Sequence, residues 1–277
     1  MRPASRSSAR TQNSPNLESQ IRELVRQLLQ TPPRPEAPAQ ARDASRNRKK
    51  PGSRPSLASR IDHTLLKPDA TREQVLAACA EARASGFASV CVHSHWLPEV
   101  TRALKGSATL PIAVIGFPHG AMLPEAKAAE TLLAVKAGAR EIDMVLNLGR
   151  LKSREWKAVH DDIRGVVSAA GRAPVKVILE TCLLSAEEKA AAAVISELAG
   201  AAFVKTSTGF STGGATLEDI ALLRRVVGPE VRIKASGGIR TRDFAEALIA
   251  AGADRLGASS STTLIAGTPP APASGSY

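Results

Sequence analysis

One pattern occurs four times in this sequence: an alanine-rich, helix-like run ends at a glycine, and a run of β-forming residues follows at once. The four segments are residues 86–90, 138–142, 200–204 and 252–256. Their first glycines lie 52, 62 and 52 residues apart, which leaves room for about two βα units in each interval. Glycine suits the left-handed residue that closes a helix. The pattern therefore predicts a chain in which helices and strands alternate.

Eight segments between the expected helices have the character of strands. They are residues 61–66, 89–93, 112–117, 141–146, 175–180, 202–206, 232–236 and 254–257. Capping-box spacing, or a looser version of it, marks helix starts at the pairs Thr71/Gln74, Ser185/Glu188 and Thr216/Asp219. Eight βα units over about 220 residues predict an α/β fold of the (β/α)8 TIM-barrel class, with a doubly wound open sheet as the alternative.

The positive charge of the chain is concentrated at its beginning. The formal net charge is +11, but residues 1–56 hold 12 Lys or Arg against 4 acidic residues, so +8 belongs to them and +3 to the rest. The Arg, Ser, Pro and Gln that dominate this segment bury too little apolar surface to offset the entropy of ordering. We expect a disordered basic extension over 1–56, a barrel domain over 57–267 and a flexible tail over 268–277.

One part of the extension has a helical pattern. Leu17, Ile21, Leu24 and Leu28 fall on one face of a possible short amphipathic helix over residues 16–30. Such a helix can dock on a partner, on a membrane surface or on its own barrel, and a marginal helix within the extension is the favoured interpretation. We therefore expect removal of residues 1–55 to leave the fold and the activity largely intact. The Arg- and Ser-rich start also resembles an organellar transit peptide.

Cysteine use and hydropathy indicate the compartment. The three cysteines, Cys79, Cys91 and Cys182, have spacing typical of neither a disulfide framework nor a CxxC metal pair. No apolar run approaches the roughly 18 residues of a membrane span, and the N-terminus lacks the apolar core of a secretory signal. The expectation is a soluble, cytoplasmic protein with reduced thiols and no membrane contact.

Charged residues end several of the expected strands, where the reactive face of a barrel lies. The period of two places Asp143 inside the barrel, together with Lys205 and Lys234 from adjacent strands about 5 Å apart. Two crowded ammonium groups lower the pKa of at least one of them, and a neutral amine can attack a carbonyl. The alternative is that these three residues and Asp62 simply neutralise one another as an internal ion network.

Two glycine-rich segments follow the seventh and eighth strands, where many barrels hold a phosphate group. Together with the residues just past Lys205 they predict a site for a phosphorylated substrate. The candidate binding residues are Thr208, Gly209, Gly237, Gly238, Gly257, Ser259 and Ser260.

Five segments resemble the deoxyribose-phosphate aldolase family. They are Asp-His-Thr-Leu-Leu at 62–66, Gly-Phe-Pro-His-Gly at 116–120, Glu-Ile-Asp-Met-Val at 141–145, Phe-Val-Lys-Thr-Ser-Thr-Gly at 203–209 and Lys-Ala-Ser-Gly-Gly-Ile-Arg at 234–240. The resemblance runs in order from about residue 57 to 267. It implies a TIM barrel in which Lys205 forms an imine, Lys234 tunes it and Asp143 relays protons through a water molecule. Asp62 is a further candidate catalytic residue.

The activity implied by the resemblance is reversible cleavage of 2-deoxyribose 5-phosphate to acetaldehyde and glyceraldehyde 3-phosphate, without a metal or an organic cofactor. Dimers or larger homo-oligomers are common among members. Some members also resemble this chain in ending with a tyrosine that reaches the barrel mouth, so Tyr277 is a candidate for proton transfer at the enamine carbon.

Three rival interpretations remain open. A metal-dependent hydrolase barrel is suggested by His93 and His95, whose alternating spacing can place two imidazoles on one metal, although further ligands are missing at later strand ends. The basic extension can act as a tether to nucleic acid, but it lacks interleaved aromatic residues, and no nucleic acid is expected for the barrel. A Schiff-base aldolase for another phosphorylated sugar is the third, because loops set the substrate.

Overall fold

The computed structural model describes residues 17–30 and 56–267. The second range contains eight strands, β1 (Ile61–Thr64), β2 (Ser89–His93), β3 (Leu110–Ile115), β4 (Glu141–Val145), β5 (Val175–Ile178), β6 (Phe203–Lys205), β7 (Arg232–Ser236) and β8 (Arg255–Ala258). Each strand pairs in parallel with the next, and β8 pairs with β1. The closure confirms the predicted (β/α)8 barrel and excludes the open-sheet alternative. Every predicted strand is present, with ends that differ by two residues at most.

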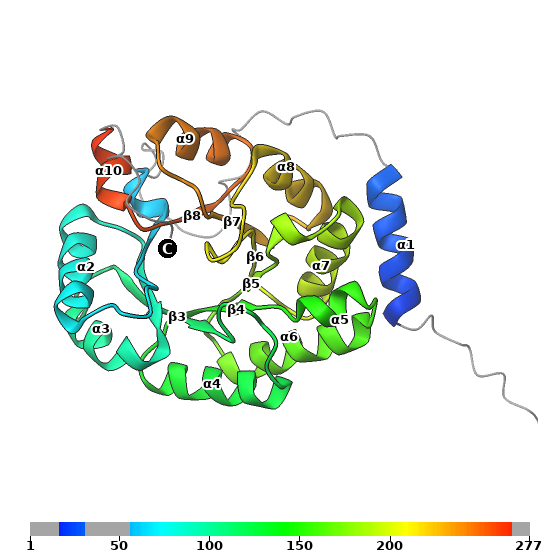
Figure 1. The fold of residues 1–277 in the computed structure, drawn as a ribbon, viewed down its shortest axis with the longest axis horizontal. Coiled ribbons are helices and arrows are strands. Elements are labelled where there is room, and N and C mark those ends of the chain that lie inside the picture. Colours follow the sequence, from blue (N-terminus) through cyan, green and yellow to red (C-terminus); the bar gives the residue numbers. More distant parts are fainter. Residues whose placement is uncertain (1–16, 31–55, 268–277) are drawn as a thin grey trace, which may run out of the picture.

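Helices surround the barrel as an outer ring, and the first helix of the chain lies outside that ring (Figure 1). They are α1 (Leu17–Gln30), α2 (Arg72–Ser85), α3 (Leu97–Ala103), α4 (Pro124–Lys136), α5 (Leu148–Lys152), α6 (Trp156–Ala170), α7 (Ala186–Leu198), α8 (Leu217–Val226), α9 (Arg242–Ala250) and α10 (Ser261–Ala266), with 3₁₀ turns at Ala58–Arg60, Ser94–Trp96 and Thr181–Leu183. Within residues 17–30 and 56–267, none of these helices has the length and apolarity to cross a lipid bilayer.

The local signals in the sequence act as predicted. Gly86, Gly138, Gly200 and Gly252, which begin the four repeated segments, all have positive φ angles between 68° and 119°, a conformation that costs glycine little. Capping boxes form at Thr71 and at Ser185. Each hydroxyl accepts the backbone N–H of the third helical residue, and the side chain of that residue accepts the backbone N–H of the capping residue. These turns hold the helices against the outside of the barrel.

The hydrophobic core has two parts. The larger one lies between the outward side chains of the strands and the inward faces of the helices. The smaller one lies inside the barrel and consists of Leu66, Cys91, Ile112 and Val114, with Phe117 packed against it. Because apolar residues from β2 and β3 fill that side of the interior, charged groups are confined to the side formed by β4 to β8 and β1.

Helix α1 lies outside the ring of helices, alongside α7 (Figure 1). Ile21 and Val25 are almost fully buried and belong to the larger core. The guanidinium carbon of Arg22 lies 4.9 Å from the centre of the Trp156 ring, which anchors the helix to α6 as well. The helix given as possible over residues 16–30 is present as α1, and in the structure it docks on its own barrel. Residues 1–16, 31–55 and 268–277 lie outside the described residues, and so do the predictions made for them.

Candidate active site

Three charged side chains meet inside the barrel: Asp143 from β4, Lys205 from β6 and Lys234 from β7. The Nζ atoms of both lysines lie 2.8 Å from the same oxygen, Oδ2 of Asp143. The strand register pairs Lys205 directly with Lys234, as expected for inward side chains on adjacent strands. All three side chains are buried. The structure thus brings together the residues that the sequence singled out for carbonyl chemistry.

Asp62 joins this group from β1. Its Oδ2 lies 2.6 Å from Nζ of Lys234, and its Oδ1 lies 2.6 Å from Nη1 of Arg255. The hydroxyl of Ser89 donates a hydrogen bond of 2.6 Å to the same Oδ1. Asp62 therefore contacts Lys234 directly, and it influences Lys205 through Lys234 and Asp143.

Lys176 on β5 is a member of the cluster that sequence reasoning missed. Its Nζ lies 2.8 Å from Oδ1 of Asp143, 2.6 Å from Oε2 of Glu141 and 3.9 Å from Oδ2 of Asp62. One Asp143 oxygen is thus held by Lys176, and the other is shared by Lys205 and Lys234. The available signal was a lysine at an inward position of an otherwise apolar strand, which the register pairs with Asp143.

The cluster holds one more cation than anions when every group is charged. The cations are Lys176, Lys205, Lys234 and Arg255, and the anions are Asp62, Asp143 and Glu141. An uncompensated charge is costly in a buried site. Loss of one proton from a lysine would balance the cluster. The ion-network interpretation is therefore geometrically correct, and it is compatible with one neutral amine.

The surroundings of the lysines favour Lys205 as the neutral one. Burial lowers the pKa of Lys205, and the charge of Lys234 lowers it further, against the opposing effect of Asp143. Burial alone would also lower the pKa of Lys234, but Asp143 and Asp62 outweigh it and raise that pKa well above its usual value. Burial disfavours the charged form of Asp143, yet Lys176, Lys205 and Lys234 hold its pKa well below the usual range. Of these two lysines, Lys205 is therefore the one whose surroundings favour the neutral amine, and Lys234 is the one whose surroundings favour the ammonium form.

The predicted phosphate-binding segments lie together at the carboxyl ends of β7 and β8. The two strands pair Ser236 with Gly257, which places Gly237 and Gly238 beside the segment that contains Ser259 and Ser260. Gly237 and Gly238 have φ angles of 84° and 74°, so this turn requires residues that tolerate the left-handed region. Ser259 and Ser260 are exposed.

Gly257 faces the lysine cluster itself. A Cβ atom at this position would lie 3.0 Å from Cε of Lys234 and 3.0 Å from Cβ of Ser236. The absence of a side chain at Gly257 therefore provides the space through which Lys234 reaches Asp143.

Glu180 holds the loop after β6 and was also missed from the sequence. Both of its carboxylate oxygens accept the backbone N–H of Thr208 at 3.3 Å, and Oε2 also accepts the Thr208 hydroxyl. Glu180 is buried and has a φ of 55°, a strained conformation for a residue with a side chain. Strand β5 ends at Ile178, two residues before Glu180, so Glu180 ties Thr208 and Gly209 to the segment at the carboxyl end of β5.

His93 and His95 do not form a metal centre with other side chains in the described part of the chain. Their rings stack with centroids 6.2 Å apart, and Nε2 of His93 lies 3.0 Å from the carbonyl oxygen of Leu66. Among residues 17–30 and 56–267, no group of three His, Cys, Asp or Glu side chains has a geometry that could hold a metal ion. Tyr277 lies outside the described residues.

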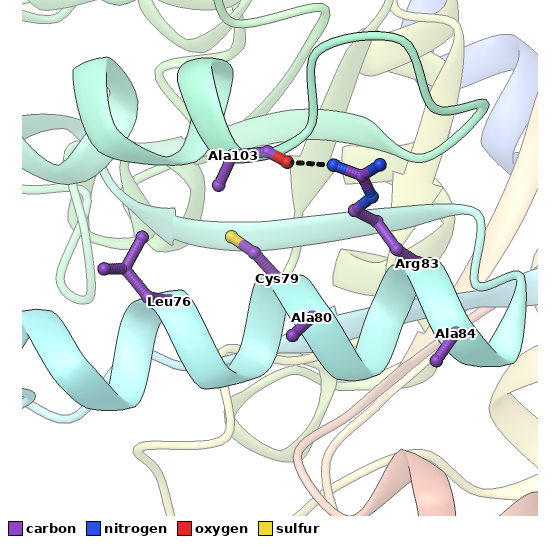
Figure 2. Close-up of a pocket in the computed structure, with 6 residues that line it drawn as sticks. All are labelled: Leu76, Cys79, Ala80, Arg83, Ala84 and Ala103. Carbon is purple, nitrogen blue, oxygen red and sulfur yellow. Dashed lines mark hydrogen bonds between the residues drawn. The ribbon is translucent and has the colours of Figure 1, made fainter.

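A surface pocket between α2 and α3 lies away from this site (Figure 2). Arg83 crosses it and donates a hydrogen bond of 2.7 Å to the carbonyl of Ala103, while Leu76 and Cys79 line its floor. The pocket runs along α2 from Leu76 to Ala84, in the outer ring of helices. Lys205 and Lys234 lie inside the barrel, on β6 and β7.

Comparison with known proteins gives one consistent result. The model of the DeoC/LacD aldolase family matches residues 57–268. Deoxyribose-phosphate aldolase from Listeria monocytogenes is 54% identical over 217 residues, which cover 78% of this chain and 97% of that protein.

Solved structures agree. A structure described as a deoxyribose-phosphate aldolase from Coccidioides immitis has a TM-score of 0.79 at 36% identity, and the match covers 90% of this chain and 96% of that one. Deoxyribose phosphate aldolase from Aeropyrum pernix, described as having a unique tetrameric structure, has a TM-score of 0.71 at 36% identity and covers 76% of this chain and 89% of its own. The match to the Coccidioides immitis structure covers 90% of this chain and the other match covers 76%, so the first match includes residues beyond the barrel.

Proposed function

The chain belongs to the DeoC/LacD family of aldolases, and we propose that it cleaves 2-deoxyribose 5-phosphate reversibly to acetaldehyde and glyceraldehyde 3-phosphate through an imine on Lys205. The observation that carries the residue assignment is the shared Asp143 oxygen, with Lys205 and Lys234 at equal distances of 2.8 Å. The pKa values of the two lysines are shifted in opposite directions: that of Lys205 is lowered and that of Lys234 is raised. A neutral amine at Lys205 can attack the carbonyl carbon. The neighbouring Lys234 ammonium can then stabilise the negative charge that develops on the carbonyl oxygen.

In the cleavage direction, the Lys205 amine attacks C1 of the open-chain sugar, and loss of water gives a protonated imine. Asp143, through a water molecule, removes the proton of the C3 hydroxyl as the C2–C3 bond breaks, and the bonding electrons move to the imine nitrogen. Glyceraldehyde 3-phosphate leaves, and an enamine remains on Lys205. Protonation at C2 and hydrolysis then release acetaldehyde and the free amine. The steps need no metal or organic cofactor.

The remaining candidates have defined places in this proposal. Lys176 fixes the Asp143 carboxylate, and Asp62 keeps Lys234 charged. The phosphate of the substrate binds near Gly237, Gly238, Ser259 and Ser260, with Thr208 and Gly209 completing the polar lining; Gly257 leaves room for Lys234. Tyr277 remains a candidate for proton transfer at the enamine carbon, and slower exchange of acetaldehyde methyl protons with solvent in Tyr277→Phe would support that role.

Borohydride reduction in the presence of acetaldehyde tests the central assignment. The expected product is one stable adduct, which peptide mass analysis places on Lys205. Lys205→Met should abolish the adduct, and the exposed Lys157→Met should retain it. An adduct on Lys234 would reverse the two roles. A coupled assay of acetaldehyde release from 2-deoxyribose 5-phosphate, run beside other sugar phosphates, decides between this substrate and a different phosphorylated sugar.

We also propose a homo-oligomer that works in the cytoplasm. The tetrameric description of the Aeropyrum pernix relative supports the first part, and the three unpaired cysteines support a reducing compartment. Light scattering of the purified full chain would measure the mass of the assembly.

A further inference from the structure

Two phenylalanines from separate loops meet at the carboxyl-end face of the barrel. Phe117 follows β3, and Phe210 follows β6, five residues after Lys205. Their ring centroids are 5.1 Å apart and their planes are at 88°, an edge-to-face arrangement that aromatic pairs prefer. This contact joins loops from non-adjacent strands across the mouth of the barrel.

The Phe117 side of the pair is fixed to the protein. Gly116 donates its backbone N–H to Oε2 of Glu130 at 2.9 Å, and the stem of Lys127 packs on the same glycine. A Cβ atom at Gly120 would lie 2.1 Å from the carbonyl oxygen of Leu146, so the other end of the loop is pressed against the chain after β4. Both ends of the loop from 116 to 120 are therefore in close contact with neighbouring segments.

Phe117 also packs into the interior of the barrel, which holds the lysine cluster as well. It packs against the apolar group inside the barrel that contains Cys91. The pKa of the Cys91 thiol, raised mainly by burial, also responds to the charges of Asp143, Lys234 and Lys205. Phe117 thus covers the apolar side of the barrel interior, which is formed by residues of and after β1 to β3.

Phe210 is the more accessible partner. Its side chain is 36% exposed, and its backbone N–H donates to the Thr208 hydroxyl at 3.0 Å. Thr208 is in turn held by Glu180. The position of the Phe210 backbone is therefore linked to β5, whereas its ring borders solvent.

We propose that Phe117 and Phe210 form an aromatic gate over the barrel mouth that selects the aldehyde joined to or released from the Lys205 enamine. This inference rests on the proposed aldolase function. The two rings offer an apolar surface, so they suit the carbon chain of the aldehyde, while the phosphate is directed to the loops after β7 and β8. In an apolar pocket, one methylene group more or less on the substrate changes kcat/KM by about 10- to 200-fold.

The test compares acceptor aldehydes at constant acetaldehyde donor. In Phe210→Ala, the ratio of kcat/KM for 3-phenylpropanal to that for propanal should rise about tenfold or more, because space opens beside Phe117. In Phe210→Trp the ratio should fall. Leu133→Ala is the matched control, since Leu133 is 64% exposed on α4, and it should leave the ratio unchanged.

Borohydride trapping on Lys205, measured in each variant, separates the two proposals. If the unaltered enzyme forms no adduct, the aldolase assignment is lost. If adducts form normally and neither Phe210 variant changes the ratio, the gate alone is overturned. Should Phe210→Ala fail to fold, Phe210→Leu and Phe210→Trp carry the same comparison.

Discussion

Besides burial, the positive charge of Lys234 is one of the causes that lower the pKa of Lys205. The pKa of Lys205 is lowered by burial and then by the positive charge of Lys234. Lys234→Met removes that charge and leaves Asp143 and Asp62 to stabilise the Lys205 ammonium, so the pKa of Lys205 should rise. The pH profile of imine trapping should then move to higher pH by about one unit or more. A profile that stays in place, or moves to lower pH, would show that Lys234 does not set the protonation of Lys205.

Lys176 offers a test of positioning within the same cluster. Lys176→Met removes the cation that holds Oδ1 of Asp143 and lies nearest Glu141, but Asp143 keeps Lys205 and Lys234 on its other oxygen and Glu141 keeps Arg255 at 3.4 Å. The unfolding free energy should therefore fall, by less than the roughly 3–5 kcal/mol expected when a buried charge loses its whole partner. Misplacement of Asp143 should also lower kcat by about 100-fold while trapping on Lys205 continues. Urea denaturation and steady-state kinetics measure the two effects. Lys157→Met, at a side chain that is 70% exposed, is the control and should change neither.

Gly257 tests whether space near Lys234 matters. The added methyl group of Gly257→Ala would meet Lys234 and Ser236 at 3.0 Å, so one of them has to shift. Overpacking of this kind costs about 1–3 kcal/mol, and displacement of Lys234 should shift the pH profile of trapping in the same direction as Lys234→Met. Gly165→Ala, in the interior of α6 where a Cβ meets nothing within 4 Å, should leave the pH profile unchanged and should raise the unfolding free energy by up to about 1 kcal/mol.

The residues found from the sequence and those missed differ in their local context. Lys205, Lys234 and Asp143 stand out because each is a charged residue at an inward position near the end of a short apolar strand. Lys176 has a similar inward position, but nothing in the segment 175–178 shows which carboxylates it meets. That information lies in the register between β4 and β5. Glu180 was hidden for another reason, because its role depends on a left-handed backbone that sequence alone did not reveal.

At the scale of elements, α1 is the part most open to test. Ile21 is fully buried against the barrel helices, so Ile21→Ala should lower the unfolding free energy by about 2–5 kcal/mol. Arg26→Ala, at a side chain that is 63% exposed, should change it by less than about 0.5 kcal/mol. Equal stability of both variants in urea denaturation would mean that α1 is not docked in solution.

Docking of α1 was not predictable from its own pattern. The apolar face of residues 17–30 shows that the helix needs a partner surface, but it does not identify that surface. The surface is largely α7, where the run from Ala190 to Ala193 is buried. Small side chains let two helices approach closely, yet an alanine run alone is equally typical of an exposed helix. Truncation of residues 1–30 should therefore destabilise the enzyme, contrary to the expectation from sequence.

For the molecule as a whole, the closed barrel was predictable because every local signal agreed. Four glycine-ended repeats, eight apolar segments and the helix caps all indicate the same alternation. Closure itself follows from counting eight units, and the pairing of β8 with β1 confirms it. The same closure concentrates seven charged groups in one interior, and this makes the stability of the whole molecule depend on pH.

Acid should destabilise this enzyme through its buried carboxylates. Burial alone would raise the pKa values of Asp62 and Asp143, but the surrounding cations outweigh it and hold both well below the usual range. Since the folded pKa values are depressed, the stabilisation they represent is complete above the unfolded value of about 3.9. It is lost as the pH falls from there toward the folded pKa values, because the unfolded chain binds protons that the native cluster excludes.

Asp62→Asn tests whether the Asp62 carboxylate makes the unfolding free energy depend on pH, or whether its removal only deletes a contact. The variant should be less stable than the parent at pH 7, because Lys234 and Arg255 lose a buried partner, and the difference should narrow as the pH falls below about 4. Glu246→Gln, on the exposed surface of α9, should follow the parent at every pH. Urea denaturation at a series of pH values measures all three proteins. A constant difference between parent and Asp62→Asn across the acid range would mean that the Asp62 carboxylate is not the group that couples folding to pH.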